Sequence, residues 1–234
     1  MASTKLRRTL SGNGNQNIAT FSVWVKRSGL GDGRIWSSWY DSNYQFWIMF
    51  QDDKLGVKLY QNSYVFQLET TRKFRDTSAW YHIVIAIDTT QGTASDRIKM
   101  YINGVQETDF GSNSYPGSSQ SMPFGLASYN QRIGERDSGD YFDGILSHFH
   151  YIDGTAYTPS TFGETDTNGQ WKIIPQPSVT YGTNGFFILK DGNSVTDQSG
   201  NSNNWTVSGG TLTNTSDCPS NVYCTFNPLI PQGL

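Results

Sequence analysis

Two carboxylates close together in the sequence are the first residues that could perform catalysis. Glu135 and Asp137 flank Arg136, so in a β-strand they would point to the same face. Retaining glycosidases need two carboxyl groups about 5 Å apart, which such a strand could supply. Ser138-Gly139 interrupts the strand directly afterwards, and this pattern is typical of a solvated turn. We therefore predict that the protein is not an enzyme, and glycoside hydrolysis is the weakest alternative.

The aspartates that follow have the chemistry of calcium ligands. Asp137, Asp140 and Asp143 could direct several oxygens at one ion, which hard cations require. Asp-Gly and Ser-Gly turns also produce scattered aspartates that bind nothing. A calcium site at these residues is thus an alternative prediction, and we expect no other cofactor.

Two histidines alternate in the next expected strand. His148 and His150 would share one face, as a metal site requires, but local spacing fixes no third ligand. Hydrogen-bonded histidines at the surface or at an interface are the favoured interpretation.

Aromatic residues are densest between positions 36 and 50. Rings in the strands of a β-sandwich usually fill the core. The alternative is a stacking surface for sugar rings, since aromatic faces pack against the apolar faces of pyranoses. Its best candidates are Tyr40, Asp41, Asn43 and Tyr44, because YDSNY is typical of an exposed turn between two strands.

The two cysteines, Cys218 and Cys224, are six positions apart. That spacing fits no common zinc site, because two thiolates cannot fill four coordination positions. A local disulfide and two free thiols are both compatible with the sequence.

Residues 80–103 show the clearest strand pattern, and the other elements are expected to surround them. Between Tyr81 and Ile87 both alternating sets are largely apolar, which indicates a strand buried inside a stack of sheets. Residues 98–102 alternate more cleanly, and Asn103-Gly104 then suits a tight type I′ turn. The sequence therefore predicts an all-β antiparallel sandwich.

Composition agrees with this fold class and excludes several functions. The 234 residues are 35% hydrophobic and 14% aromatic and include 24 glycines, which suits short strands joined by Gly-rich turns. A net charge of -3 with scattered basic residues argues against nucleic-acid binding. No window approaches the roughly 18 apolar residues of a membrane span. The N-terminal residues predict neither a secretory signal nor a membrane anchor, so we expect synthesis in a cytosol.

We expect three parts along the chain. Residues 1–19 would form a polar N-terminal arm, either flexible or an ordered edge segment, and residues 20–158 the jelly-roll core. Residues 159–234 would be a C-terminal extension of short strands, too few for a core of their own, that packs on the sandwich and ends in a tail at 227–234. The polar stretch 108–130 predicts a long surface loop with a strand inside it.

Several distinct sequence words resemble one family. They are TFSVWVKRS, SAWYHIVIAIDTTQGTASDRIKMYINGVQ, YFDGILSHFHYIDGTAYTPSTFGETDTNGQWK, YGTNGFFIL and DQSGNSNNWTV. In this order, over about residues 5–228, they resemble the laminin-G-like, concanavalin A-like jelly-roll proteins of marine bacteriophages and cyanophages. The resemblance implies a two-sheet antiparallel jelly roll and a structural role in the virion, as a head fibre, decoration protein or tail-associated component. Cys218 and Cys224 stand where small or polar residues would be expected, which slightly favours their pairing.

The resemblance sets the functional expectation. We expect a virion structural protein, made in the host cytoplasm, whose partners are other capsid or tail proteins and which also contacts a host surface glycan. A homo-oligomer is expected, with a trimer favoured because phage fibres are generally built that way. The alternative is a calcium-dependent carbohydrate-binding lectin with its site around Tyr40 to Tyr44.

Overall fold

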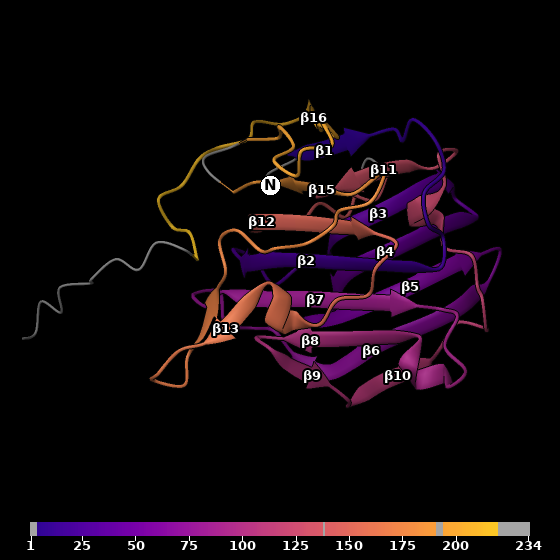
Figure 1. Ribbon diagram of the computed structural model, residues 1–234, viewed down its shortest axis with the longest axis horizontal. Coiled ribbons are helices and arrows are strands. Elements are labelled where there is room, and N and C mark those ends of the chain that lie inside the picture. Colours follow the sequence, from indigo (N-terminus) through magenta and orange to yellow (C-terminus); the bar gives the residue numbers. More distant parts are fainter. Residues whose placement is uncertain (1–3, 138, 191–193, 220–234) are drawn as a thin grey trace, which may run out of the picture.

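The computed structural model describes residues 4–137, 139–190 and 194–219, which form two stacked antiparallel sheets (Figure 1). The larger sheet has the strand order β10 (Phe110–Ser114), β6 (Tyr64–Lys73), β5 (Lys54–Gln61), β4 (Tyr44–Gln51), β3 (Gly33–Asp41), β11 (Asn130–Ile133), β1 (Lys5–Arg8) and β16 (Thr206–Gly209). The smaller sheet has the order β15 (Phe186–Ile188), β12 (Gly144–Asp153), β2 (Ile18–Arg27), β7 (Tyr81–Asp88), β8 (Ile98–Ile102) and β9 (Val105–Glu107). The predicted all-β jelly-roll sandwich is confirmed.

The hairpin of β7 and β8 has the geometry that its sequence predicts. Ile83, Ile85 and Ile87 face the main core, and each is at most 1% exposed. The turn residues Asn103 and Gly104 have φ values of 50° and 81°, as a type I′ turn requires. The opposite face of β7 is buried as well, so the nearly continuous apolar run reflects cover on both sides.

Large rings fill the space between the two sheets. Trp36 of β3 and Phe21 of β2 come from opposite sheets, and their ring centroids lie 5.0 Å apart in an edge-to-face arrangement. The long loop after β10 adds Met122 and Phe124, both fully buried in the same core. Each such side chain contributes about 1.5–3 kcal/mol through burial. Three of the seven rings between positions 36 and 50, those of Trp36, Phe46 and Phe50, belong to this core, so the favoured interpretation holds for only part of the dense stretch.

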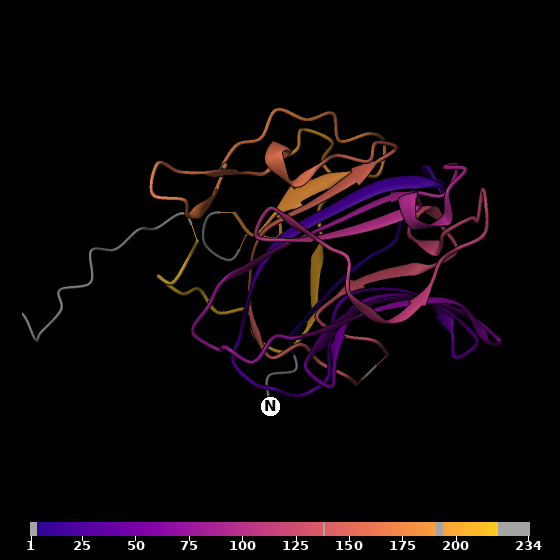
Figure 2. The same cartoon turned by 90° about the horizontal axis from the view of Figure 1, so that it is seen from below.

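A second, smaller core covers the outer face of the smaller sheet. Here the extension after β12 folds back over the sheet and includes the short pair β13 (Gly163–Thr165) and β14 (Trp171–Ile173) (Figure 2). The apolar residues of this core are Val84, Ile152, Phe162, Tyr181 and Phe187. The protein therefore has three layers: the larger sheet, the smaller sheet, and the extension that covers the outer face of the smaller sheet.

All three histidines of the chain lie beneath this layer. His82, His148 and His150 are at most 2% exposed. His148 and His150 are therefore not at the surface but at a buried interface, the other placement that the sequence favoured. The ring of His82 is bonded at both nitrogens, since its Nε2 lies 2.9 Å from the Ser22 hydroxyl and its Nδ1 accepts a hydrogen bond from the Trp171 indole at 2.9 Å.

The ring of His150 stacks on Phe187 at 3.9 Å, and its Nδ1 lies 2.9 Å from the Tyr181 hydroxyl. Burial lowers the pKa of His82 to about 3 and holds that of His150 well below its ordinary value. These rings are therefore neutral parts of the packed interface.

Segments far apart in the chain complete the larger sheet. β1 lies between β11 and β16, with Leu6 opposite Ile133 on one side and Val207 on the other. The segment predicted as an N-terminal arm thus contains a strand that is paired on both sides. In the extension, β15 and β16 each take the edge of one sheet.

Helical structure in the described part of the chain is limited to three single 3₁₀ turns: η1 (Ala94–Asp96), η2 (Pro123–Gly125) and η3 (Pro159–Thr161). Over these same residues, no helix is long and apolar enough to cross a membrane.

Candidate functional site

The predicted YDSNY turn joins β3 to β4 and lies beside a second hairpin tip. The backbone N–H of Asn62, in the turn between β5 and β6, donates a hydrogen bond of 2.8 Å to the carbonyl of Asn43. Its side-chain amide donates to the Tyr44 hydroxyl at 2.9 Å. Within the first turn, the carboxylate of Asp41 accepts a hydrogen bond of 2.7 Å from the N–H of Asn43. The two tips therefore hold each other in a fixed arrangement.

Three tyrosine rings gather at this corner of the larger sheet. Tyr40 is 56% exposed, whereas Tyr44 is half-buried and Tyr129 is buried. The Tyr40 ring lies 5.5 Å from that of Tyr129 and 6.3 Å, edge-on, from that of Tyr44. Burial, with a smaller effect of the nearby Asp41 charge, raises the pKa of Tyr129, so its hydroxyl stays protonated. The Tyr40 ring is thus exposed to solvent, and the rings of Tyr129 and Tyr44 support it.

The structure brings the four predicted glycan-contact residues together. Tyr40 and Asn43 are exposed, while Asp41 and Tyr44 are half-buried. The corner offers an open ring beside amide and carboxylate groups, a combination that can stack on a sugar and bond its hydroxyls. Whether a glycan binds there stays a prediction.

A second set of rings lies on the outer face of the larger sheet, and the sequence did not indicate it. The Arg132 guanidinium lies 5.2 Å from the centroid of Trp39, and those of Arg34 and Arg136 lie 5.5 and 5.8 Å from that of Trp47. Such cation–π pairs fix both partners. They join β3 and β4 to the segment around residues 132–136, so no local spacing could have shown them.

The three aspartates predicted as calcium ligands have other roles here. Asp137 forms an ion pair with Arg132 at 3.0 Å, and Asp140 pairs with Arg34 at 3.0 Å and Arg136 at 3.5 Å. Asp143 is exposed and lies beside Gly29. Across residues 4–137, 139–190 and 194–219, no three His, Cys, Asp or Glu side chains are grouped to hold a metal ion. The geometry does not support the calcium alternative, which stays a prediction.

Glu135 is fully buried and sits in an ion-pair network. It contacts Arg7 and, at 3.4 Å, Lys5. Burial alone would raise the pKa of Glu135, but the hydrogen bond from Arg7 and the charges of Arg7, Lys5 and Arg132 bring it below its ordinary value. A carboxylate kept ionised in this way is poorly suited to donate a proton in glycoside hydrolysis.

Of the two cysteines, Cys218 alone is described. Its sulfur lies 3.6 Å from the Ser147 hydroxyl. Cys224 lies outside the described residues, so the disulfide stays a prediction.

Comparisons with known proteins place this fold in a family. Residues 5–161 match the family model described as the concanavalin A-like lectin/glucanases superfamily. No curated protein matches.

Solved structures give the same fold at low sequence identity. A heptameric SAP-like pentraxin from Limulus polyphemus is 21% identical at a TM-score of 0.52, over 82% of this chain and 87% of its own. A Bacteroides ovatus protein described as a candidate carbohydrate-binding protein is 15% identical at a TM-score of 0.52, over 93% of this chain and 61% of its own.

Domain 4 of the extracellular arabinanase AbnA from Geobacillus stearothermophilus, in complex with arabinotriose, is 20% identical at a TM-score of 0.46. This match covers 62% of the present chain and 65% of that domain. Because the family match spans well over half of the sequence, the protein belongs to the concanavalin A-like lectin/glucanases superfamily.

Proposed function

We propose that this protein is a non-catalytic glycan-binding component of a phage virion, which contacts a host surface glycan through the corner around Tyr40. The observation that carries the glycan proposal is the exposed Tyr40 ring, held against Tyr129 and Tyr44 and flanked by Asp41 and Asn43. The exposed ring is a candidate for ligand contact because it is held in place beside amide and carboxylate groups that can bond sugar hydroxyls.

The corner offers a single strongly exposed ring, that of Tyr40, so we expect each site to bind weakly. One stacked ring and a few hydrogen bonds leave most of a sugar in solvent. Several copies on one particle would compensate, because linked sites raise the overall affinity without new contacts. A homo-oligomer, with a trimer favoured, fits this requirement. Light scattering of the purified protein tests the oligomer directly.

The virion location is supported by the sequence words shared with phage jelly-roll proteins. We propose synthesis in the host cytoplasm and assembly with other capsid or tail proteins. Mass spectrometry of purified particles should detect the protein. Its absence from particles would overturn this part of the proposal and leave the glycan part standing.

Tyr40→Ala is expected to weaken glycan binding about 30-fold, because truncating an aromatic anchor costs about 2 kcal/mol. The measurement is titration against the best ligand found on a glycan array. Tyr64→Ala is the matched control, since Tyr64 is 50% exposed but packs on Tyr60, outside the Tyr40 group. Equal losses in both variants, or no sugar bound by the wild type, including host lipopolysaccharide, would contradict the assignment of the site.

The competing functions are separated in the same experiments. A calcium-dependent lectin would lose binding in EDTA, whereas binding through the Tyr40 corner is expected to persist. Any measured hydrolysis that disappears in Glu135→Gln would favour the glycosidase alternative. We expect no such Glu135-dependent activity, since this carboxylate is buried and ion-paired.

A further inference from the structure

A cavity of about 600 Å³ lies between the two sheets at the edge where β1 faces β12. Its deep wall is formed by side chains that belong to the main core: Leu6, Ile133, Phe142 and Leu189. Leu146 of β12 also lines it and is only partly buried. This volume falls within the 300–1,000 Å³ typical of small-molecule sites. The cavity is far too large for a packing defect in a well-ordered core.

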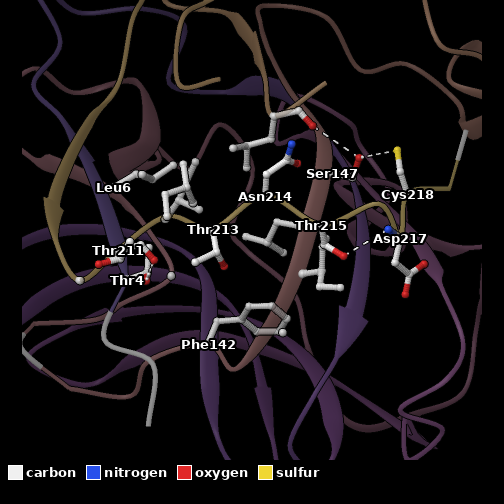
Figure 3. Close-up of a pocket in the computed structure, with 18 of the residues that line it drawn as sticks. Thr4, Leu6, Phe142, Ser147, Thr211, Thr213, Asn214, Thr215, Asp217 and Cys218 are labelled. Carbon is white, nitrogen blue, oxygen red and sulfur yellow. Dashed lines mark hydrogen bonds between the residues drawn. The ribbon is translucent and has the colours of Figure 1, made fainter. Parts of the chain in front are cut away.

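One stretch of chain, residues 210–218, crosses the open side of this cavity; we call it the strap (Figure 3). At the larger sheet it follows β16, and the Thr4 hydroxyl donates a 2.7 Å hydrogen bond to the carbonyl of Thr211. At the smaller sheet Asp217 forms an ion pair with Lys26 at 2.6 Å and accepts a 2.9 Å hydrogen bond from the Trp80 indole. The strap is thus fastened at both ends.

Between these ends the strap has little apolar anchorage. From Thr211 to Ser216 only Leu212 is apolar, and the other five residues are exposed. Figure 3 shows Thr213, Asn214 and Thr215 along the strap, among the residues that line the cavity. A segment with so little buried apolar surface is easy to open locally. A molecule could therefore enter when the Asp217 end is released.

The lining determines what kind of molecule would fit. Its only charged residues among those described are Lys190 and Asp217. Lys190 donates to Gln176 at 3.0 Å, and Asp217 is held by Lys26 and Trp80. Because the Asp217 carboxylate is already paired with Lys26, a positively charged ligand would find no free counter-ion there and would lose its hydration.

We propose that this cavity binds a mainly apolar small molecule without a positive charge, with its body against Leu6, Phe142 and Leu146 and any hydroxyl towards the threonines of the strap. Burial of apolar surface would supply the affinity, at about 25 cal/mol per Å². The site is separate from the Tyr40 corner and requires neither glycan binding nor a virion location.

The test uses the whole 234-residue chain and N-phenyl-1-naphthylamine, a neutral and hydrophobic fluorescent probe. The probe itself is excited, rather than the tryptophans of the protein. We expect saturable uptake of one probe per chain. Leu146→Trp, which fills the cavity from a strand, should weaken uptake at least tenfold. Val105→Trp, which adds the same ring at a position 72% exposed, should leave it within twofold of the wild type. Probe that fails to saturate, or that binds a folded Leu146→Trp protein as well as the wild type, would overturn the proposal.

Competition between the probe and twelve-carbon chains with different head groups tests which ligand charge the cavity accepts. Dodecanol should displace the probe below its solubility limit, whereas dodecylamine at the same concentration should not. Equal displacement by dodecylamine would refute the assignment of a ligand without a positive charge.

A second variant tests the proposal even if the Leu146→Trp protein does not fold. Asp217→Asn leaves the apolar lining intact and removes the ion pair with Lys26. Stopped-flow measurement should then show faster association and faster dissociation of the probe. Unchanged rates would refute entry past the strap.

Discussion

Asp53→Asn is expected to lower the free energy of unfolding by about 3 kcal/mol, because it leaves a buried guanidinium without its counter-charge. Arg27 is 2% exposed, and its Nη1 lies 3.2 Å from Asp53 Oδ1. The carbonyls of Phe74 and Gly31 accept its other hydrogen bonds at 2.6 and 3.1 Å. Neither of these two uncharged carbonyls can neutralise the positive charge of the Arg27 guanidinium.

Asparagine is the informative replacement for Asp53. The residue has φ 65°, a left-handed conformation that Asn tolerates nearly as well as Asp, so backbone strain does not enter the comparison. Arg75 also pairs with Asp53, at 2.8 Å, but its side chain is 60% exposed. Arg75→Ala is therefore the control and should cost less than about 1 kcal/mol. Urea denaturation measures both. A loss in Asp53→Asn no larger than that in Arg75→Ala would refute the argument.

Acid should destabilise the protein well before its carboxylates are protonated. His82 has a folded pKa of about 3 against an ordinary value of 6.5, so between these values the unfolded chain binds one more proton than the folded one. The stabilisation is therefore complete above pH 6.5 and decreases as the pH falls towards 3. At pH 5 the loss from His82 alone is about 2 kcal/mol. His150, whose pKa burial also lowers, adds to it.

Chemical denaturation at several pH values between 4 and 7.5 tests this expectation. The informative quantity is the slope of stability against pH, since a merely disruptive substitution lowers stability at every pH. His82→Gln and His150→Gln should each flatten the slope, and the double variant should flatten it most. Unchanged slopes in both single variants would show that these rings do not control the acid response.

The sequence predicted the central part of the fold because its signals there are local. Alternation between Tyr81 and Ile102 and the Asn103-Gly104 turn fix a hairpin without reference to anything distant. The Tyr40 to Tyr44 turn was found in the same way, from residues that strongly favour turns.

What the sequence did not show depends on distant partners. The sequence left open whether His148 and His150 lie at the surface or at an interface. It predicted that the extension packs on the sandwich, but this segment is rich in turns and has no strand period, so nothing local indicated that it covers β7 and β12. Arg132 reaches Trp39 only because β11 pairs with β3. The cavity likewise forms beside β12 and residues 210–218, whose sequence GTLTNTSDC carries no structural signal.

The position of β1 has a consequence for how the chain reaches its folded state. β1 is synthesised before both of its partner strands, because Leu6 pairs with Ile133 and Val207, which leave the ribosome much later. Until then its hydrogen-bonding groups have no strand to join, and the growing sheet keeps an open edge that can associate with other chains. Pairings this distant in sequence also slow folding, because the entropy of closing a long loop is lost before the paired strands form any stabilising contact. The last step of folding is therefore expected to be the insertion of β1 and the addition of β16, which complete the sheet together.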